Sequence, residues 1–441
     1  MDRTDPTPIA IPDFALVLLI GPAGAGKSTF AARHFALDEV IATDALRGQI
    51  AGDEADQSVN AEVFRVLHEQ VEERLRARRL TVVDATNVLA HVRKPLVDLA
   101  ARYHAPAVAL VLAPPLETCL AQNAARPGRV VPAEAVRWQH ANLRAALLTL
   151  HSEPFTAIHA FTSPEEIAAA RLTRMPLPAD LRDQHGPFDI IGDVHGCLDE
   201  LVELLGLLGC RIEGDPAAPD AGEVIPPPGR TVVFLGDYVD RGPAPVGVLR
   251  LVMGMHAAGT AICVQGNHDV KLARALEGRQ VRQIHGLRET LAALQEEPQA
   301  FREAVRAFIR GLNPHYALDD ERLVVAHAGM LPQYQMRESR AVRAFALYGD
   351  TTGRYDEHGL PIRRNWALTY SGASRVAYGH TPVTHAVWIN NTINLDTGCS
   401  FGNLLSALRW PEDEIVTVRA RRTYFAPLRG PFPPDWQIPE G

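Results

Sequence analysis

Short apolar runs alternate with longer segments of helical periodicity from residue 14 onward, and this alternation restricts the possible folds more than any other feature. Five early runs have the length and composition of buried strands: FALVLLI (14–20), EVIAT (39–43), TVVDAT (81–86), AVALVLA (107–113) and TAIHAF (156–161). Between them, residues 62–79 and 92–103 have helical spacing, and Pro132 is placed to open a further helix. Strands that alternate with helices predict a doubly wound α/β domain with a parallel sheet.

A second strand-led series begins at FDIIGD (188–193) and continues to about residue 425. Pro, Gly and polar residues collect before it and predict a linker, and the Pro/Gly-rich segment 213–230 predicts a surface loop. We therefore expect four parts: an α/β domain over 1–172, a linker over 173–186, a second α/β domain over 187–425, and a Pro-rich tail over 426–441.

The composition is that of a soluble globular protein, with 46% apolar and 22% charged residues in 441. A net charge of −8 argues against broad, charge-driven coating of nucleic acid, although it leaves local gripping of a strand end open. FALVLLI is too short to span a membrane, and we see no signal peptide, so no membrane partner is expected. The five cysteines are scattered without a C-x-x-C pair, which indicates neither a zinc knuckle nor a disulfide framework and fits the reducing cytoplasm.

The stretch GPAGAGKST (21–29) satisfies the pattern G-x-x-x-x-G-K-[ST] between a predicted strand and a predicted helix. Glycines let successive backbone N–H groups point at a phosphate, the lysine reaches the β and γ oxygens, and the following hydroxyl can bind Mg²⁺. We predict an ATP and Mg²⁺ site made by Gly21, Gly24, Gly26, Lys27, Ser28 and Thr29.

Polar residues at later strand ends could complete a phosphotransferase. Asp44 could accept the proton of an attacking hydroxyl and Arg47 could hold an anionic acceptor, although a helix cap and a solvated arginine remain alternatives. Asp84 ends the third predicted strand and could bind magnesium water or cap a helix. Arg126 and Arg129 lie on a Gly/Pro loop that could close over the phosphates or be a plain turn.

Five Gly-flanked polar clusters follow apolar runs in the second half: IIGDVHGC, FLGDYVDRG, CVQGNHD, VVAHAG and AYGHTPV. Two divalent cations about 3.5–4 Å apart need oxygen and imidazole ligands and one bridging carboxylate. The clusters supply this set, with Mn²⁺ as the expected metal. The first metal would take Asp193 and His195, the second would take Asn267, His327 and His380, and Asp237 would bridge them.

Three further residues of these clusters suit catalysis better than metal binding. Arg241 could hold a phosphoryl oxygen. His268 adjoins a predicted ligand, so it is better interpreted as the acid that protonates the leaving oxygen, with Asp240 orienting its ring.

The P-loop, the Asp44-x-x-Arg47 step, the D-A-T-N strand end and the Arg-bearing loop resemble the polynucleotide 5′-kinase branch of P-loop phosphotransferases over residues 10 to 170. The resemblance implies Asp44 as general base for a 5′-hydroxyl, Arg47 on the acceptor's phosphate and Arg126 on the donor.

The motif order G-D-x-H-G, G-D-x-x-D-R-G, G-N-H-D, H-A-G and G-H-T resembles the PPP (calcineurin-like) metallophosphoesterases over residues 187 to 410. It implies an α/β metallophosphoesterase sandwich after the P-loop sheet, with Asp396 supporting the metals from behind. The family usually has Glu where Asp269 stands. A second phosphate-binding arginine is expected between His327 and His380, for which the candidates are Arg354, Arg363 and Arg364.

Kinase followed by phosphatase resembles the bacterial polynucleotide kinase-phosphatases of end healing, without their ligase-like domain. This implies ATP-dependent phosphorylation of 5′-hydroxyl ends and removal of 3′-phosphate or 2′,3′-cyclic phosphate ends, with RNA or DNA strand ends as partners and sealing by a separate ligase. The alternative is a signalling enzyme that combines a small-molecule kinase with a protein phosphatase or a dinucleoside-polyphosphate hydrolase. A nucleotide-dependent scaffold is a third possibility, against which Asp44 argues because mere binding needs no base.

Overall fold

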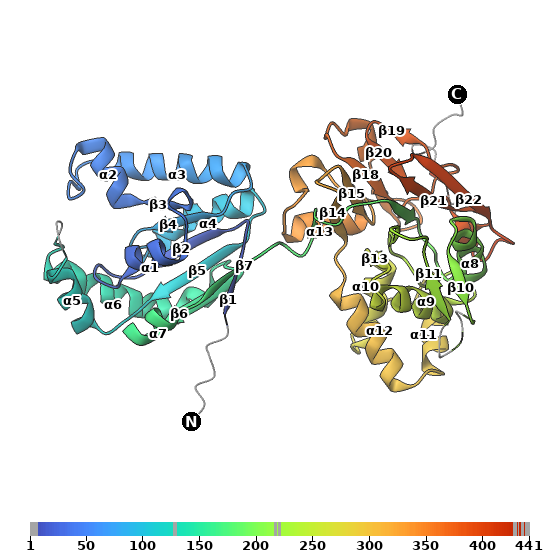
Figure 1. The fold of residues 1–441 in the computed structure, drawn as a ribbon, viewed down its shortest axis with the longest axis horizontal. Coiled ribbons are helices and arrows are strands. Elements are labelled where there is room, and N and C mark those ends of the chain that lie inside the picture. Colours follow the sequence, from blue (N-terminus) through green and yellow to red (C-terminus); the bar gives the residue numbers. More distant parts are fainter. Residues whose placement is uncertain are drawn as a thin grey trace. The chain divides into compact units, whose positions relative to one another are not determined.

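The computed structural model describes residues 8–126, 130–215, 218, 222–426, 430, 432, 433 and 436. The chain divides into two compact units, coloured blue to green and green to red in Figure 1. Unit 1 contains Met1–Leu177 with Arg337–Ser339, and unit 2 contains Pro178–Met336 with Arg340–Gly441.

Unit 1 is built on one parallel sheet with the strand order β3-β4-β2-β5-β6 (Figure 1). Its strands are β2 (Leu16–Ile20), β3 (Val40–Ala42), β4 (Thr81–Asp84), β5 (Ala107–Leu112) and β6 (Ala157–Phe161). Its helices are α1 (Lys27–His34), α2 (Thr43–Ala51), α3 (Asn60–Arg76), α4 (Ala90–Arg102), α5 (Leu116–Ala124), α6 (Ala133–Thr149) and α7 (Pro164–Ala169). Each strand lies within a predicted apolar run, so the predicted doubly wound sheet is confirmed.

Both faces of this sheet are covered by helices. Alternate residues of β2 enter different cores: Leu16 and Leu18 pack with the apolar stripes of α3 and α4, whereas Val17 and Leu19 pack with α1 and α5. This double burial explains why the strands are continuous apolar runs rather than alternating ones.

Several short strands were not predicted. One is β11 (Glu223–Ile225), which lies within the segment 213–230 expected as a surface loop, and three more lie near the ends of unit 1 and the start of unit 2 in the sequence. β1 (Ile9–Pro12) pairs in parallel with β7 (Leu172–Met175), and β8 (Asp180–Leu181) pairs with a strand of unit 2. β8 and most of β7 lie within the segment expected as a linker. Their pairing partners are distant in sequence, and strand formation that depends on such partners leaves little local signal.

Unit 2 contains two packed sheets, which confirms the predicted α/β sandwich (Figure 1). The first has the order β13-β12-β9-β21-β22: β13 (Ala261–Cys263), β12 (Thr231–Phe234), β9 (Phe188–Ile191), β21 (Leu404–Trp410) and β22 (Glu414–Arg419). The second has the order β19-β20-β18-β15-β14-β8: β19 (Trp388–Ile389), β20 (Thr392–Asn394), β18 (Arg375–Tyr378), β15 (Leu323–Ala326), β14 (His315–Leu318) and β8. Ile190 and Val233 of the first sheet share one core with Leu318 and Val325 of the second.

Helices cover the outer faces of both sheets. The first sheet packs against α8 (Leu198–Leu207), α9 (Pro245–Ala257), α10 (Asn267–Leu276), α11 (Leu287–Gln295) and α12 (Gln299–Gly311). The second packs against α13 (Arg340–Tyr348) and a 3-10 turn at Trp366–Thr369, and Trp436 of the expected tail is buried in the same core. Two hairpins complete the unit: β10 (Arg211–Glu213) with β11 (Glu223–Ile225), and β16 (Thr351–Tyr355) with β17 (Pro361–Arg363). Among the described residues, no helix has the length and apolar character that a membrane crossing requires.

Candidate active sites

The predicted phosphate loop connects β2 to α1, and its glycines are required by local geometry. Gly24 and Gly26 have φ angles of 77° and 88°, the left-handed region that L side chains rarely adopt. A Cβ on Gly24 would lie 2.1 Å from the carbonyl oxygen of Cys119, and one on Gly21 would lie 2.5 Å from that of Leu112. The loop can therefore keep its curvature only with glycine at these positions.

Lys27 is held inside this loop. Its Nζ donates to the carbonyl oxygen of Pro22 at 2.9 Å. Burial lowers the pKa of Lys27, and the nearby charges of Asp84 and Asp44 act in the opposite direction. Ser28, by contrast, is exposed in the first turn of α1, as is Thr29. The hydroxyls of Ser28 and Thr29 are thus exposed, while the ammonium group of Lys27 is bound to a backbone carbonyl of the loop.

Asp44 lies in the first turn of α2, next to two arginines. The N-cap of α2 is Ala42, so Asp44 does not cap this helix. Nη1 of Arg47 is 2.5 Å from Oδ1 of Asp44, and Nη2 of Arg126 is 3.8 Å from Oδ2. Arg47 is only 7% exposed and also donates to Asn60 at 2.9 Å, so it orients Asp44 rather than extending into solvent.

Of the two other residues predicted for this site, the structure describes Asp84 only. Asp84 ends β4 and is buried, and because Leu89 is the N-cap of α4, Asp84 does not cap that helix. Arg129 lies outside the described residues.

In unit 2, the ends of six strands bring the predicted metal ligands together. Asp193 and His195 follow β9, Asp237 follows β12, Asn267 begins α10 after β13, His327 follows β15, His380 follows β18, and Asp396 follows β20. Except for His380 and Asn267, which are partly exposed, these side chains are buried.

Asp237 lies between two groups of predicted metal ligands. Its Oδ2 is 3.5 Å from Nε2 of His195, and its Oδ1 is 3.5 Å from Nε2 of His327. Nε2 of His327 is in turn 2.9 Å from Oδ1 of Asn267 and 3.1 Å from Nδ1 of His380. The two carboxylate oxygens of Asp237 therefore face different sets of ligands, as a bridging carboxylate requires.

The grouping of possible metal-binding atoms differs from the prediction at His268, the predicted acid, and at Asp193, a predicted ligand. Ligand atoms of His195, Asp237 and His268 lie within 4.8 Å of one another, as do those of Asp237, His327 and His380. Asp193 accepts the backbone N–H of His380 at 3.2 Å through either oxygen. The space for this contact depends on Gly379, whose Cβ would lie 2.0 Å from Oδ1 of Asp193.

Electrostatics at this centre favour bound cations. Burial raises the pKa of Asp237 to about 7 and that of Asp396 to about 6. The pKa of Asp193 is raised by burial and then by the charges of Asp396 and Asp237. Burial also lowers the pKa of His327 to about 3, which leaves the imidazole neutral, the form that binds metal.

The donor set also contains buried atoms without a protein partner. Among the described residues, Nε2 of His380 and Oδ2 of Asp396 have no hydrogen-bond partner. Carboxylate, amide and imidazole donors in this combination suit hard to borderline divalent cations, so the residues present fit the two metals that the motifs imply.

His268 is oriented by a second, deeper pair of residues. Its Nδ1 is 2.6 Å from Oδ2 of Asp240, and Thr290 on α11 donates to Oδ1 of Asp240 at 2.7 Å. The other ring nitrogen of His268, Nε2, lies 3.2 Å from Nη2 of Arg241. The second terminal nitrogen of the same guanidinium, Nη1, is 2.8 Å from Nε2 of His195. The guanidinium thus lies between the predicted acid and a predicted metal ligand.

The structure separates the three candidates for a second phosphate-binding arginine. Burial, and after it the charge of Arg363, lowers the pKa of His380, and Nε of Arg363 donates to the carbonyl oxygen of Tyr348 at 3.1 Å. Arg364 is instead 3.1 Å from Asp350, and Arg354 is exposed on β16. Arg363 is therefore the candidate that the structure favours.

Two supporting residues were missed as such by sequence reasoning. Thr290 is fully buried and belongs to a helix with no motif, so only the fold reveals it. Asp269 accepts backbone N–H groups of Asp237 at 2.9 Å, Tyr238 at 3.0 Å and Gly266 at 2.9 Å. The G-N-H-D motif draws attention to this position, but its function is to join two loops rather than to bind metal.

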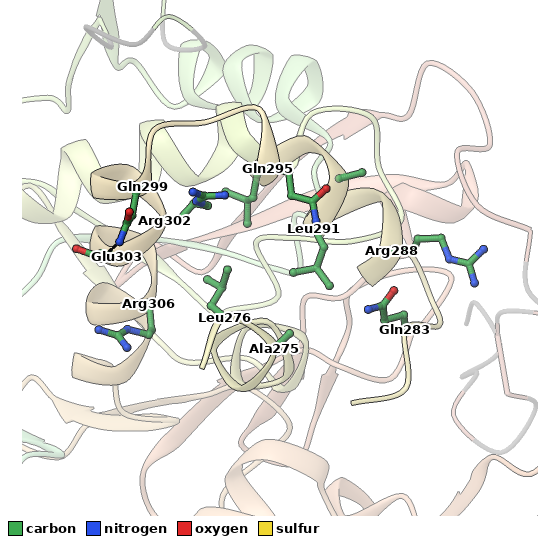
Figure 2. Close-up of a pocket in the computed structure, with 12 residues that line it drawn as sticks. Ala275, Leu276, Gln283, Arg288, Leu291, Gln295, Gln299, Arg302, Glu303 and Arg306 are labelled. Carbon is green, nitrogen blue, oxygen red and sulfur yellow. Dashed lines mark hydrogen bonds between the residues drawn. The ribbon is translucent and has the colours of Figure 1, made fainter. Parts of the chain in front are cut away.

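A separate pocket of about 620 Å³ opens between α10, α11 and α12 (Figure 2). Leu276 and Leu291 lie in its middle, between Arg288 on one side and Arg306 on the other. None of the predicted site residues lines this pocket.

Comparison with known proteins finds one matching family for each unit. Residues 16–147 match the AAA domain family, and residues 186–384 match the calcineurin-like phosphoesterase family. The asymmetrical bis(5'-nucleosyl)-tetraphosphatase PrpE of Anoxybacillus flavithermus is 42% identical over 249 residues, which are 56% of this chain and 99% of the relative. The protein of the same name from Bacillus velezensis is 44% identical over 244 residues, which are 54% of this chain and 95% of that protein. A solved protein serine/threonine phosphatase of Saccharomyces cerevisiae is similar over 55% of this chain and 82% of its own, with 13% identity and a TM-score of 0.39.

Fold and site together define a phosphoesterase that carries an additional P-loop unit of the AAA type. The chain belongs to the calcineurin-like phosphoesterase family.

Proposed function

We propose that unit 2 hydrolyses dinucleoside polyphosphates with two divalent cations, Mn²⁺ being the expected metal. One observation carries the chemistry: the two oxygens of Asp237 face His195 and His327, each 3.5 Å away. Support for the substrate class comes from the relatives named bis(5'-nucleosyl)-tetraphosphatase, which this chain matches along 95% and 99% of their length. Those relatives favour the hydrolase alternative over end healing, the interpretation that the motifs of unit 1 suggested.

In this proposal the metals would be held by the predicted ligands and would supply positive charge and acidified water at the phosphate. Water forms a bond to one phosphorus of the polyphosphate chain, and the P–O bond to the neighbouring phosphate breaks. Arg241 and Arg363 hold the oxygens of the phosphoryl group. His268, oriented through Nδ1 by Asp240, would act in its protonated form and give a proton to the leaving oxygen, so that two nucleotides are released.

For unit 1 we propose transfer of a phosphoryl group from ATP to a hydroxyl acceptor. The support is the group of Asp44, Arg47 and Arg126 beside the phosphate loop, because a site for nucleotide binding alone needs no carboxylate oriented by two arginines. Asp44 would take the proton of the acceptor hydroxyl, and Arg126 would neutralise charge on the transferred group. The same three residues favour a second candidate for the whole chain, namely phosphorylation of 5′-hydroxyl ends together with removal of 3′-phosphate ends.

One experiment separates the two candidates. The full chain with Mn²⁺, Mg²⁺ and ATP is incubated in parallel with diadenosine tetraphosphate and with an oligonucleotide bearing a 5′-hydroxyl and a 3′-phosphate. Cleavage of the dinucleotide, lost in Asp237→Asn and kept in Lys27→Ala, is the expected result. Conversion of both oligonucleotide ends, with the dinucleotide left intact, would overturn the proposal in favour of end healing.

A further inference from the structure

Aromatic side chains gather beside the predicted acid of unit 2. The ring of His285 is 6.5 Å from that of His268, and the ring of Phe425 is 6.4 Å from that of His285. Phe401 continues the series at 6.3 Å from Phe425, and the guanidinium of Arg241 lies 4.9 Å from the centre of the Phe401 ring. His285, Phe401 and Phe425 are all partly exposed.

Backbone contacts connect two of these aromatic residues to their neighbours. Phe425 donates its N–H to the carbonyl of Ser400 at 2.9 Å, which holds it against the neighbouring Phe401. His285 precedes Gly286, where a Cβ would lie 2.1 Å from the backbone nitrogen of Arg241. The aromatic surface is therefore tied directly to the segment that carries the phosphate-binding arginine.

A cation lies at the edge of the same surface. Lys271 is one helical turn beyond His268 on α10, and its Nζ donates to the carbonyl of Ile284 at 3.3 Å. Its charge acts on the pKa of His268 and of His285, in each case after burial and Arg241. The surroundings of the predicted acid thus combine a positive charge with partly exposed rings.

We propose that His285, Phe401 and Phe425, with Lys271 at their edge, form a subsite that stacks the base of a nucleotide next to the phosphoesterase centre. Every nucleobase has a π-face that stacks on aromatic rings, and a phosphate attached to the nucleoside meets Arg241 or Lys271. Phosphoserine, phosphothreonine and inorganic phosphate have no ring that could stack there. This subsite rests on the proposed phosphoesterase function and adds that the ligand is recognised through its base.

The test compares AMP, ribose 5-phosphate and inorganic phosphate as competitive inhibitors of p-nitrophenyl phosphate hydrolysis by the full chain with Mn²⁺. Base–aromatic stacking corresponds to about five- to 150-fold in affinity. We expect AMP to inhibit at least about tenfold more tightly than ribose 5-phosphate. Phe425→Leu should remove this advantage and leave inhibition by inorganic phosphate unchanged, which also shows that the centre is still folded.

Two further variants keep the test decisive. Phe425→Trp retains a ring and should preserve the preference for AMP. Tyr355→Leu removes an aromatic side chain that is 69% exposed on β16 and should change nothing. Equal inhibition by AMP and ribose 5-phosphate in the unsubstituted protein, or an unaltered preference in Phe425→Leu, would overturn the subsite. Preference for AMP without cleavage of diadenosine tetraphosphate would instead refute only the proposed substrate.

Discussion

Replacing Thr290 with valine tests whether α11 orients the predicted general acid. The Thr290 hydroxyl donates to Oδ1 of Asp240 at 2.7 Å and accepts the backbone N–H of Asp240 at 3.1 Å, with both residues buried. Valine has nearly the same shape and keeps the packing, but it removes both hydrogen bonds. Loss of a hydrogen bond to a charged group costs about 1.5–3 kcal/mol. If that energy serves to hold Asp240 against His268, kcat/KM falls about 10- to 150-fold.

The assay compares phenyl phosphate, which has a poor leaving group, with p-nitrophenyl phosphate, which has a good one. A misoriented acid slows the first ester strongly and the second only slightly, because a good leaving group needs little protonation. Thr290→Ser keeps the hydroxyl and is the matched control. Equal losses on both esters, or a loss in Thr290→Ser as large as in Thr290→Val, would refute the reasoning.

The remaining predictions concern each unit separately. Asp44→Asn should abolish phosphoryl transfer from ATP to a hydroxyl acceptor while ATP binding, measured by displacement of a fluorescent nucleotide, persists; unchanged transfer would remove the proposed base. Chelation by EDTA should abolish hydrolysis of p-nitrophenyl phosphate, and Mn²⁺ should restore it; activity that survives chelation would contradict a metal centre. Gly379→Ala places a Cβ about where Oδ1 of Asp193 lies, 2.0 Å away, so elemental analysis should find less metal per chain than in the unsubstituted protein. Asp269→Asn leaves three backbone N–H groups with a poorer acceptor, which should destabilise unit 2 by roughly 1–3 kcal/mol and lower its Tm, and an unchanged Tm would show that these bonds are dispensable.

Much of the metal centre was predictable because each ligand directly follows an apolar run. Asp193, Asp237 and His327 end strands whose carboxyl ends meet at one edge of the two sheets, so strand prediction already brings them together. Thr290 and Arg363 were not predictable in this way. Thr290 depends on the path of α11, and Arg363 differs from Arg364 in that its charge acts on the pKa of His380 whereas Arg364 pairs with Asp350.

Substrate choice was the part least accessible to the motifs. Asp44-x-x-Arg47 pointed to nucleic-acid ends, and the structure does place Asp44 and Arg47 in contact. The catalytic motifs of unit 2 bind a phosphoryl group and metals, however, and those parts are shared by enzymes with very different substrates. In the proposed subsite, side chains such as Phe425 and His285 discriminate among substrates. They lie outside every motif, so only their positions near Arg241 and His268 in the fold indicate this function.

Several residues of the metal centre have strained backbone conformations, which lower the stability of the fold. His195, Asp237, Asp240, Arg241 and His380 all have φ angles between 46° and 76°, where non-glycine residues are strained. Each such residue costs about 1–3 kcal/mol, so the five together amount to a sum comparable to the whole net stability of a typical domain. The two packed sheets must offset this strain. Glycine at one of these positions should therefore yield a more heat-resistant protein with a poorer centre, and selection for stability alone would remove the activity first.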